Sequence, residues 1–362
     1  MEFPTTVSSI EERIDRIDPE AYARTRNYLS GAVSQLSAYL SRGMISPRYV
    51  YARLRQRHSA AACSRFLSEL LWREYFQRLQ QHDPSIEKNP RLGKGSGHRA
   101  VPAAIMRAAT GITAIDAAIE TLYSSGYMHN HARLYTAAVC MMAGYHYLQP
   151  APWMYYHLLD GDVASNYCSW QWVAGLHTGI RYIANQQNID RYCNTSQPGT
   201  FLDRSYEELK NVHELPGLSE QAESGFATIL PPTQEIPAGN RPILIYNSYN
   251  LDPVWNAGLD AERVLLLDPL HFREHPVSEK VMAFLLGAAR NISGIRIYTG
   301  SYAQLKRDHP SRAFIAKEHP LFDYPGARIE PREWLAEAVD GSYPSFTKYY
   351  ATVLQKYHGE FA

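Results

Sequence analysis

The segment 159-LDGDVASNYCSWQW-172 is the most informative stretch of the chain. It places two carboxylates, Asp160 and Asp162, on either side of a glycine, and follows them with Asn166 and two tryptophans. The segment lacks the further oxygen ligands of an EF-hand loop, which argues against calcium. Carboxylate and amide groups can instead bond the rim of a flat heterocycle while indoles lie against its plane. The segment therefore predicts a site for an aromatic cofactor.

The sequence around this segment has helical periodicity up to about residue 215. Segments 63–79, 113–124 and 128–147 repeat apolar residues at i, i+3, i+4 and i+7, and glycine and proline fall mostly between them. Residues 216–242 then carry five prolines and three glycines, which no regular element tolerates. We therefore expect a helical domain over 1–215, followed by a linker.

Short β-branched or leucine-rich segments follow the linker, at 243–246, 263–268 and 295–299, with a helical pattern over 277–292. This alternation is typical of βαβ units with a parallel sheet. Two more helices are expected around 332–339 and 346–357. The fold class we predict is mainly α, with an all-helical domain followed by a small Rossmann-like α/β domain over 243–362. That second half contains no G-x-G-x-x-G or G-x-x-x-x-G-K-[ST] motif, so we expect no phosphate loop there.

Composition excludes several classes of protein. The 362 residues include 36 Lys and Arg against 36 Asp and Glu, which excludes a whole-chain polycation that coats nucleic acid. The four cysteines form no C-x-x-C pair, so we expect neither a disulfide framework nor a metal site. The N-terminus has no apolar core segment, and the longest apolar stretch, 134–148, is too short to span a bilayer. We expect a cytoplasmic protein that does not bind membranes.

The positive charge is unevenly distributed. Between Arg42 and Arg107 there are thirteen Lys or Arg residues and only four acidic residues. The loop 88-KNPRLGKGSGHR-99 is basic and rich in glycine. Surface charges of this kind usually pair with acids and do nothing specific. A basic patch with a flexible loop also suits contact with phosphates, and its position around segment 66–76 favours a DNA footprint.

Three further segments carry candidate site residues. Segment 66–76, FLSELLWREYF, puts Glu69, Trp72, Arg73 and Phe76 on one helical face, which suits a polar pocket wall. The alternative is a solvent-facing Glu69–Arg73 pair worth a few tenths of a kcal/mol. Hydroxyl residues in segment 34–48 can hold phosphate or serve as ordinary helix caps. The last segment, 126-GYMHNHARL-134, adds histidine, amide and guanidinium groups.

Together these segments resemble the FAD-binding domain of the photolyase and cryptochrome superfamily over roughly residues 22–172. The resemblance rests on the patterns E-L-x-W-R-E-[FY], [WY]-M-H-N-x-x-R and D-G-D-x-x-x-N-x-x-x-W-Q-W, which occur in this order. The α/β half follows the helical half, and this inverted order resembles the short bacterial photolyases of the NewPHL group. In that group the C-terminal domain is thought to cover the FAD site.

The resemblance implies FAD as the cofactor and a set of residues that bind it. Arg133 would pair with Asp160 beside the isoalloxazine, and Asn166 would lie near N5. The full set implied for the cofactor is Tyr22, Ser34, Gln35, Leu36, Ser37, Arg73, Arg133, Asp160, Gly161, Asp162 and Asn166. Val33 stands where the family commonly has a threonine, so one hydroxyl ligand is missing.

The resemblance also implies the activity of a deoxyribodipyrimidine photolyase. Photoexcited reduced FAD would split cyclobutane pyrimidine dimers by electron transfer, in UV-damaged DNA that is preferably single-stranded, with the protein acting as a monomer. Glu69, Asn130 and Asn166 are the catalytic residues implied. The lesion contacts implied are Glu69, Trp72, Tyr127, Asn130, His131 and Trp172, and the electron-transfer residues are Trp170, Tyr147 and Trp153.

Two alternatives remain open. A cryptochrome-like blue-light photoreceptor would bind the same FAD without repair, although the retained Glu69, Asn130, Trp72 and Trp172 favour repair. A helical DNA-binding protein without flavin would leave the polar groups of the 159–172 segment without a partner. The family's methionine after the arginine is Leu134 here, and its F-N-P segment is replaced by residues 182–188, so the lesion class is less constrained than flavin binding.

Overall fold

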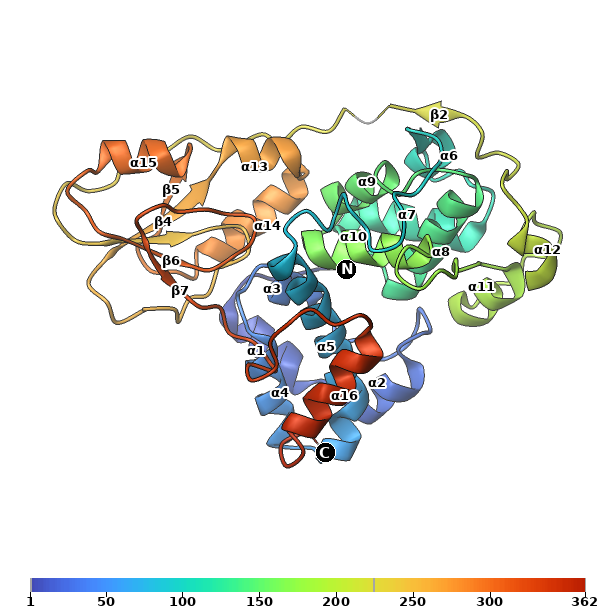
Figure 1. Ribbon diagram of the computed structural model, residues 1–362, viewed down its shortest axis with the longest axis horizontal. Helices are drawn as coiled ribbons and strands as arrows, with labels where there is room; N and C mark the ends of the chain where they lie inside the picture. Colours follow the sequence, from blue (N-terminus) through green and yellow to red (C-terminus); the bar gives the residue numbers. More distant parts are fainter. Residues whose placement is uncertain (1, 224, 362) are drawn as a thin grey trace.

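The computed structural model describes residues 2–223 and 225–361, and up to residue 210 its regular elements are helices apart from one two-residue strand (Figure 1). The helices are α1 (Val7–Asp15), α2 (Pro19–Thr25), α3 (Ser37–Ser41), α4 (Pro47–Arg55), α5 (Ala60–His82), α6 (Ala103–Met106), α7 (Thr113–Ser125), α8 (Asn130–Met142), α9 (Pro150–His157), α10 (Val163–Val173), α11 (Gln186–Cys193) and α12 (Tyr206–Lys210). The helical character expected for this half is confirmed. None of the helices in the described residues is both long and apolar enough to cross a membrane.

Local sequence signals set the ends of the helices that build the site. α5 begins where Ser59 Oγ accepts the N–H of Ala62, and α10 begins where the Asp162 carboxylate accepts the N–H of Ser165. α7 ends at Gly126, whose φ of +73° is the left-handed conformation that glycine adopts easily. The segments 126–129 and 158–162, which follow α7 and α9, therefore lie next to each other.

A five-stranded parallel sheet follows the helical part. Its strands are β3 (Ile243–Tyr246), β4 (Glu262–Leu267), β5 (Arg296–Thr299), β6 (Phe314–Lys317) and β7 (Arg328–Glu330), in the order β5-β4-β3-β6-β7, and its helices are α13 (Pro269–Glu274), α14 (Glu279–Ala289) and α15 (Tyr302–Asp308). The three expected strands and the helix of segment 277–292 are confirmed, and β6 and β7 were not expected.

Three expectations about individual elements are wrong. The helix expected over 332–339 is absent; the segment forms a turn, because the N–H groups of Leu335 and Ala336 bond the Glu74 carboxylate instead. The helix expected over 128–147 stops at Met142. The linker contains one short strand, β2 (Gln221–Ala222), which pairs antiparallel with β1 (Val101–Pro102).

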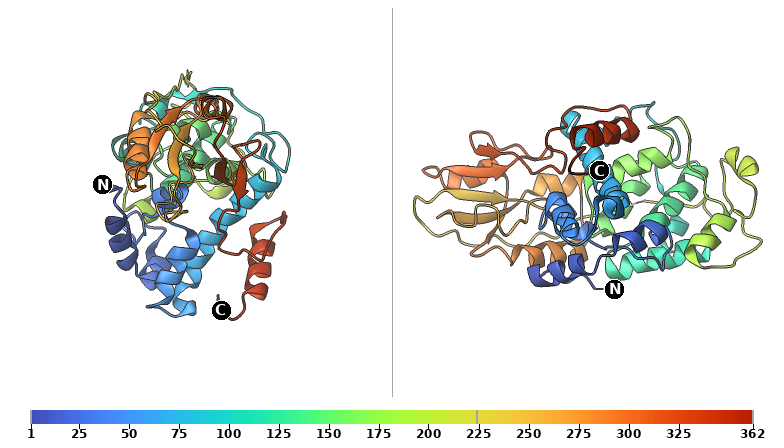
Figure 2. Two further views of the ribbon diagram at one scale, coloured as in Figure 1. Left: turned by 90° about the vertical axis from the view of Figure 1, so that its left-hand side faces the viewer. Right: turned by 90° about the horizontal axis from the view of Figure 1, so that it is seen from below.

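The last helix, α16 (Phe346–Lys356), packs against α5 rather than on the sheet (Figure 2). The chain thus returns to the helical part after the sheet is complete. α5 consequently has neighbours on two sides: the helices that carry the predicted site residues, and the C-terminal segment.

The sheet supports the helical part through the turn after α3. Arg42 is fully buried there, and its Nε donates to the carbonyl of Leu159 at 2.9 Å. The Arg42 carbonyl accepts the N–H of Leu251, just beyond β3, at 2.8 Å. At Gly43 a Cβ would lie 2.3 Å from the carbonyl oxygen of Tyr249, so only glycine fits. The loop after β3 therefore holds the 158–162 segment from behind.

Candidate functional site

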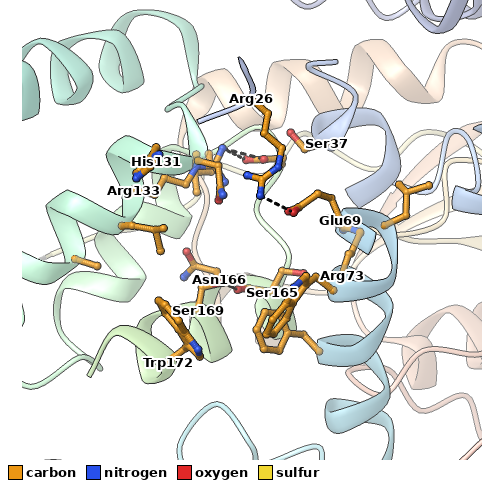
Figure 3. A pocket seen from close by; sticks show the side chains of 18 of the residues that line it. Arg26, Ser37, Glu69, Arg73, His131, Arg133, Ser165, Asn166, Ser169 and Trp172 are labelled. Carbon is orange, nitrogen blue, oxygen red and sulfur yellow. Dashed lines mark hydrogen bonds and ion pairs between the residues drawn. The ribbon is translucent and has the colours of Figure 1, made fainter. Parts of the chain in front are cut away.

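A cavity of about 560 Å³ opens between α2, α5, α8 and α10 (Figure 3). Its volume lies within the range of small-molecule sites, about 300 to 1,000 Å³. The structure brings together at this cavity most of the residues that the sequence singled out. They are Tyr22, Ser34, Ser37, Glu69, Trp72, Arg73, Tyr127, Asn130, His131, Arg133, Asp160, Asn166, Trp170 and Trp172.

One face of α5 forms the first wall, and the expected alignment of Glu69, Trp72, Arg73 and Phe76 is confirmed. The Glu69 carboxylate lies 2.9 Å from Arg65 Nη2 and 3.4 Å from Arg26 Nη2. The alternative Glu69–Arg73 surface pair is therefore not formed. Burial raises the pKa of Glu69 above its ordinary value, and the charge of Arg65 offsets this only in part.

The opposite wall comes from α8 and the 158–162 loop. Arg133 Nη2 donates to both carboxylate oxygens of Asp160, at 3.1 and 2.9 Å, as the sequence implied, and its Nε donates to the Met128 carbonyl at 2.8 Å. Asp160 is buried, so Arg133 compensates a charge that would otherwise be costly. The pair is fixed in orientation by three hydrogen bonds.

Asp162 faces away from the cavity lining. Its carboxylate accepts from Ser165 N at 2.7 Å, from Gln77 Nε2 at 3.1 Å and from Arg73 Nη2 at 3.2 Å. Burial raises the pKa of Asp162, but Arg73 and these donors outweigh burial, so the pKa lies below its ordinary value. Asp162 thus caps α10 and orients the Arg73 guanidinium, which also donates to Ser41 Oγ at 2.9 Å.

The lining of the cavity also contains groups without a partner. Ser165 Oγ and Arg26 Nε are buried and make no hydrogen bond to the described residues. Asn166 donates its Nδ2 to the Ala151 carbonyl at 3.0 Å, which leaves its Oδ1 as a free acceptor. Buried polar atoms normally have partners, so these groups indicate that a polar ligand completes the site.

His129 shapes the start of α8. Its Nδ1 accepts the N–H of His131 at 3.1 Å, which requires a neutral ring. Burial lowers the pKa of His129 to about 4, with further contributions from His131 and Arg133. The ring therefore stays neutral, and the Asn130 and His131 positions at the cavity are held by an uncharged cap.

Five implied site residues besides Asp162 do not line the cavity. Gln35 has a φ of +53° and turns away, its Oε1 accepting from Arg13 Nη1 at 2.7 Å. Tyr147 donates to the Glu87 carbonyl, and Trp153 donates to Tyr123 OH, each at 2.9 Å. These two rings are fully buried; Leu36 and Gly161 are also buried. Tyr147 and Trp153, the implied electron-transfer residues, therefore lie behind the residues that line the cavity.

Most of the cationic segment 42–107 is neutralised within the described residues. Arg42 is buried, Arg53 and Arg57 pair with Asp15, and Arg107 pairs with Glu220. The whole segment therefore cannot form the DNA-contacting surface that its charge suggested. The exposed loop 88–99 retains Lys94 and Arg99 as exposed cations.

Sequence reasoning missed several lining residues. Arg26, Asn27, Arg65, Met154, Ser165, Ser169 and Tyr182 also face the cavity. Ser165 and Ser169 stand at i−1 and i+3 of Asn166 on α10, so the helical period of the 159–172 segment indicated them. No sequence pattern indicated Arg26, because this residue, at the C-terminal end of α2, comes close to Glu69 only in the folded chain.

Comparisons with known proteins identify relatives of the helical part. A family model described as the FAD binding domain of DNA photolyase matches residues 66–220. The chain is 34% identical over 170 residues to a deoxyribodipyrimidine photo-lyase of Thermus thermophilus, covering 43% of this chain and 38% of the relative. It is 31% identical over 209 residues to a cryptochrome DASH of Synechocystis, covering 54% of this chain and 42% of the relative.

A solved Synechocystis cryptochrome structure aligns with a TM-score of 0.47 and 25% identity, over 52% of this chain and 44% of that chain. The matches to the two curated relatives thus span about two fifths of the relatives' own length.

Proposed function

Because this chain belongs to the photolyase and cryptochrome superfamily and its cofactor is FAD, we propose that it repairs UV-damaged DNA by splitting cyclobutane pyrimidine dimers in light. One observation carries the proposal. A largely buried carboxylate, Glu69, shares a single cavity with the Trp72 and Trp172 indoles and with the Arg133–Asp160 pair. A cofactor site alone does not explain an acid beside aromatic walls, whereas two adjacent, linked pyrimidines offer carbonyls for the acid and ring faces for the indoles.

The residues present fit FAD. The unpartnered Ser165 Oγ and Arg26 Nε and the free acceptor of Asn166 match a ligand with many polar atoms. Ser34, Ser37 and Arg73 would hold the phosphates, and Asp160 and Asn166 the rim of the isoalloxazine. When bound and reduced, FAD supplies one electron to the dimer on absorbing light and takes it back after both cyclobutane C–C bonds have split.

The protein would act on the dimer through Glu69 and the aromatic walls. A damaged dinucleotide is poorly stacked, so extruding it from DNA costs little, and photolyases are a known example of such base flipping. The extruded bases would pack against Trp72 and Trp172. Glu69 would hydrogen-bond a dimer carbonyl and stabilise the negative charge that develops there, and its raised pKa favours the protonated form that such a bond requires.

The α/β part takes a supporting role in this proposal. It holds the 158–162 loop through Arg42 and Leu251, and its last helix reaches α5. We propose single-stranded DNA as the preferred substrate, because a base that has no pairing partner is easier to extrude. The inverted order of the two halves supports membership of the short bacterial group.

A blue-light photoreceptor is the second candidate, and the similarity to a cryptochrome DASH favours it. The two functions separate in one experiment. The purified protein is examined for flavin absorption, then illuminated with blue light beside an oligothymidylate that carries dimers. Loss of dimers supports repair. Flavin absorption without dimer loss supports the photoreceptor, and a protein without flavin bands would contradict both.

A further inference from the structure

We propose that Phe346 and Tyr350 of α16 extend the Trp72 wall of the cavity into a stacking surface for the nucleotide next to the lesion in a single DNA strand. The inference rests on the proposed function for the identity of the substrate. Phe346 and Tyr350 lie outside the segment 66–220 that the family model matches, so their role is argued from their contacts in this structure.

Three aromatic rings form a continuous row. The Phe346 ring lies 3.8 Å from the Trp72 ring at an interplanar angle of 14°, and the Tyr350 ring lies 5.5 Å from Phe346 at 26°. Both contacts are stacked, so the ring planes run nearly parallel from the cavity wall along α16. The face of Phe346 that stacks on Trp72 is covered, so a base can stack only on the ring surface of the row that remains exposed. Bases of any sequence can do so, because every base has a π face.

The exposure of these rings distinguishes a binding surface from packing. Tyr349, which anchors the same helix, has no exposed surface. Phe346, Tyr350 and Trp72 all remain partly exposed, although a ring that only packed α16 onto α5 would be covered as Tyr349 is. The row therefore offers partly exposed ring surface that continues from Trp72, which lines the cavity.

A buried carboxylate holds this surface in place. Glu74, on the other side of α5 from the cavity, is 2% exposed and accepts from Leu335 N at 2.5 Å and from Ala336 N at 3.1 Å. It also accepts from Tyr349 OH at 2.7 Å and Arg78 Nε at 3.2 Å. The C-terminal segment is thus fixed before any ligand binds, and a preorganised surface loses little entropy on binding.

One positive charge, that of Arg91, lies near the row. Arg91, in the basic loop 88–99, donates to Tyr75 OH at 3.3 Å and to Ser342 Oγ at 3.1 Å, so the loop is tied to α5 and to the segment before α16. Lys94 and Arg99 of the same loop are exposed. Sites for single strands combine aromatic faces with a cationic groove, whereas in a duplex the bases stack on one another.

The test measures binding in the dark, so that it does not depend on repair. The probe is a labelled, undamaged oligothymidylate of about ten nucleotides, and its affinity for the FAD-loaded protein is followed by fluorescence anisotropy. We expect Phe346→Leu to weaken binding about tenfold, Tyr350→Leu to weaken it less, and binding of the same sequence as a duplex to change little. Phe226→Leu is the matched control, because it removes one ring of a stacked pair with Tyr156, on the linker side.

The outcomes are separable. If Phe346→Leu and Tyr350→Leu bind the single strand as tightly as wild type, or if they lose duplex binding equally, the stacking surface is refuted. If Phe346→Leu does not fold, Tyr350→Leu decides, since its ring lies further from α5. Absence of dimer loss in wild type under light contradicts the proposed function instead, and leaves the binding result to judge this inference.

Discussion

Replacing Asp162 tests the geometry on which the cofactor wall depends. Asp162→Asn keeps an oxygen that can accept the Ser165 N–H, and asparagine is as good a helix cap as aspartate. It loses the charge opposite Arg73, a charge-assisted bond worth about 1.5 to 3 kcal/mol. Asp162→Ala loses the cap as well, about 1 kcal/mol, and strands a largely buried guanidinium, a loss of about 3 to 5 kcal/mol.

The alanine variant should therefore be less stable than the asparagine variant by about 2 to 3 kcal/mol, a large part of a typical total of about 5 to 15 kcal/mol. Urea unfolding followed by tryptophan and flavin fluorescence measures the difference, and Gln77→Ala, which removes only one neutral donor, is the control. Because the folded pKa of Asp162 is depressed, its stabilisation is present above the ordinary value of 3.8 and is lost as the pH falls below it. Equal stability of the asparagine and alanine variants, or wild-type stability of both, would refute the reasoning.

Three further predictions concern α5 and the cofactor. Because the pKa of Glu69 is raised in the folded protein, its ionised form destabilises the folded state at pH values above the ordinary pKa of 4.5. Glu69→Gln should therefore be at least as stable as wild type at neutral pH, while its repair of dimers should be slower. Thermal melts at several pH values and a repair assay check the two expectations. Glu74→Ala should destabilise by about 3 to 5 kcal/mol, because it leaves the buried Arg78 only the more distant Asp340 as an acidic partner among the described residues and leaves the N–H groups of Leu335 and Ala336 without their acceptor. Tyr349→Phe should destabilise by only about 1 kcal/mol; similar urea midpoints for the two would contradict the clamp. Trp170→Phe should retain FAD but slow its photoreduction by an external thiol under blue light, and an unaltered rate would exclude that indole as the first electron donor.

The sequence predicted the elements whose side chains repeat with a clear period. The α5 face is one example, because Glu69, Trp72 and Arg73 are fixed by helical spacing alone. β3 is another, since an uninterrupted apolar segment of four residues that follows a proline-rich linker is typical of a buried strand of a parallel sheet. β6 was missed although residues 314–316 are apolar and buried, because an apolar run of three residues that ends at Lys317 is too short to predict a strand by itself. β7 was missed because its three residues are largely exposed and show no apolar signal.

Contacts between distant segments explain what could not be predicted. The apolar residues of 332–339 suggested a helix, but their N–H groups bond Glu74, which lies 261 residues earlier. Asp162 matched a cofactor pattern, yet its oxygens are taken by Arg73 and the cap of α10. Arg42 counted as surface charge until the loop after β3 enclosed it. In each case a polar group found its partner through the fold, which periodicity does not encode.

The inverted order of the two halves has a physical consequence for the site. Two of the contacts between the C-terminal half and the helical part lie next to the cavity: Arg42 and Leu251 support the 158–162 loop, and Phe346 stacks on Trp72. The first contact is buried and the second is partly exposed, and both involve residues that line the cavity or hold its lining, so a change in the C-terminal half should disturb the cofactor wall and the substrate wall together. A domain placed after the site in sequence can thus act as its scaffold, and α5 is the shared element, with Glu69 on its cavity face and Glu74 on its clamp face.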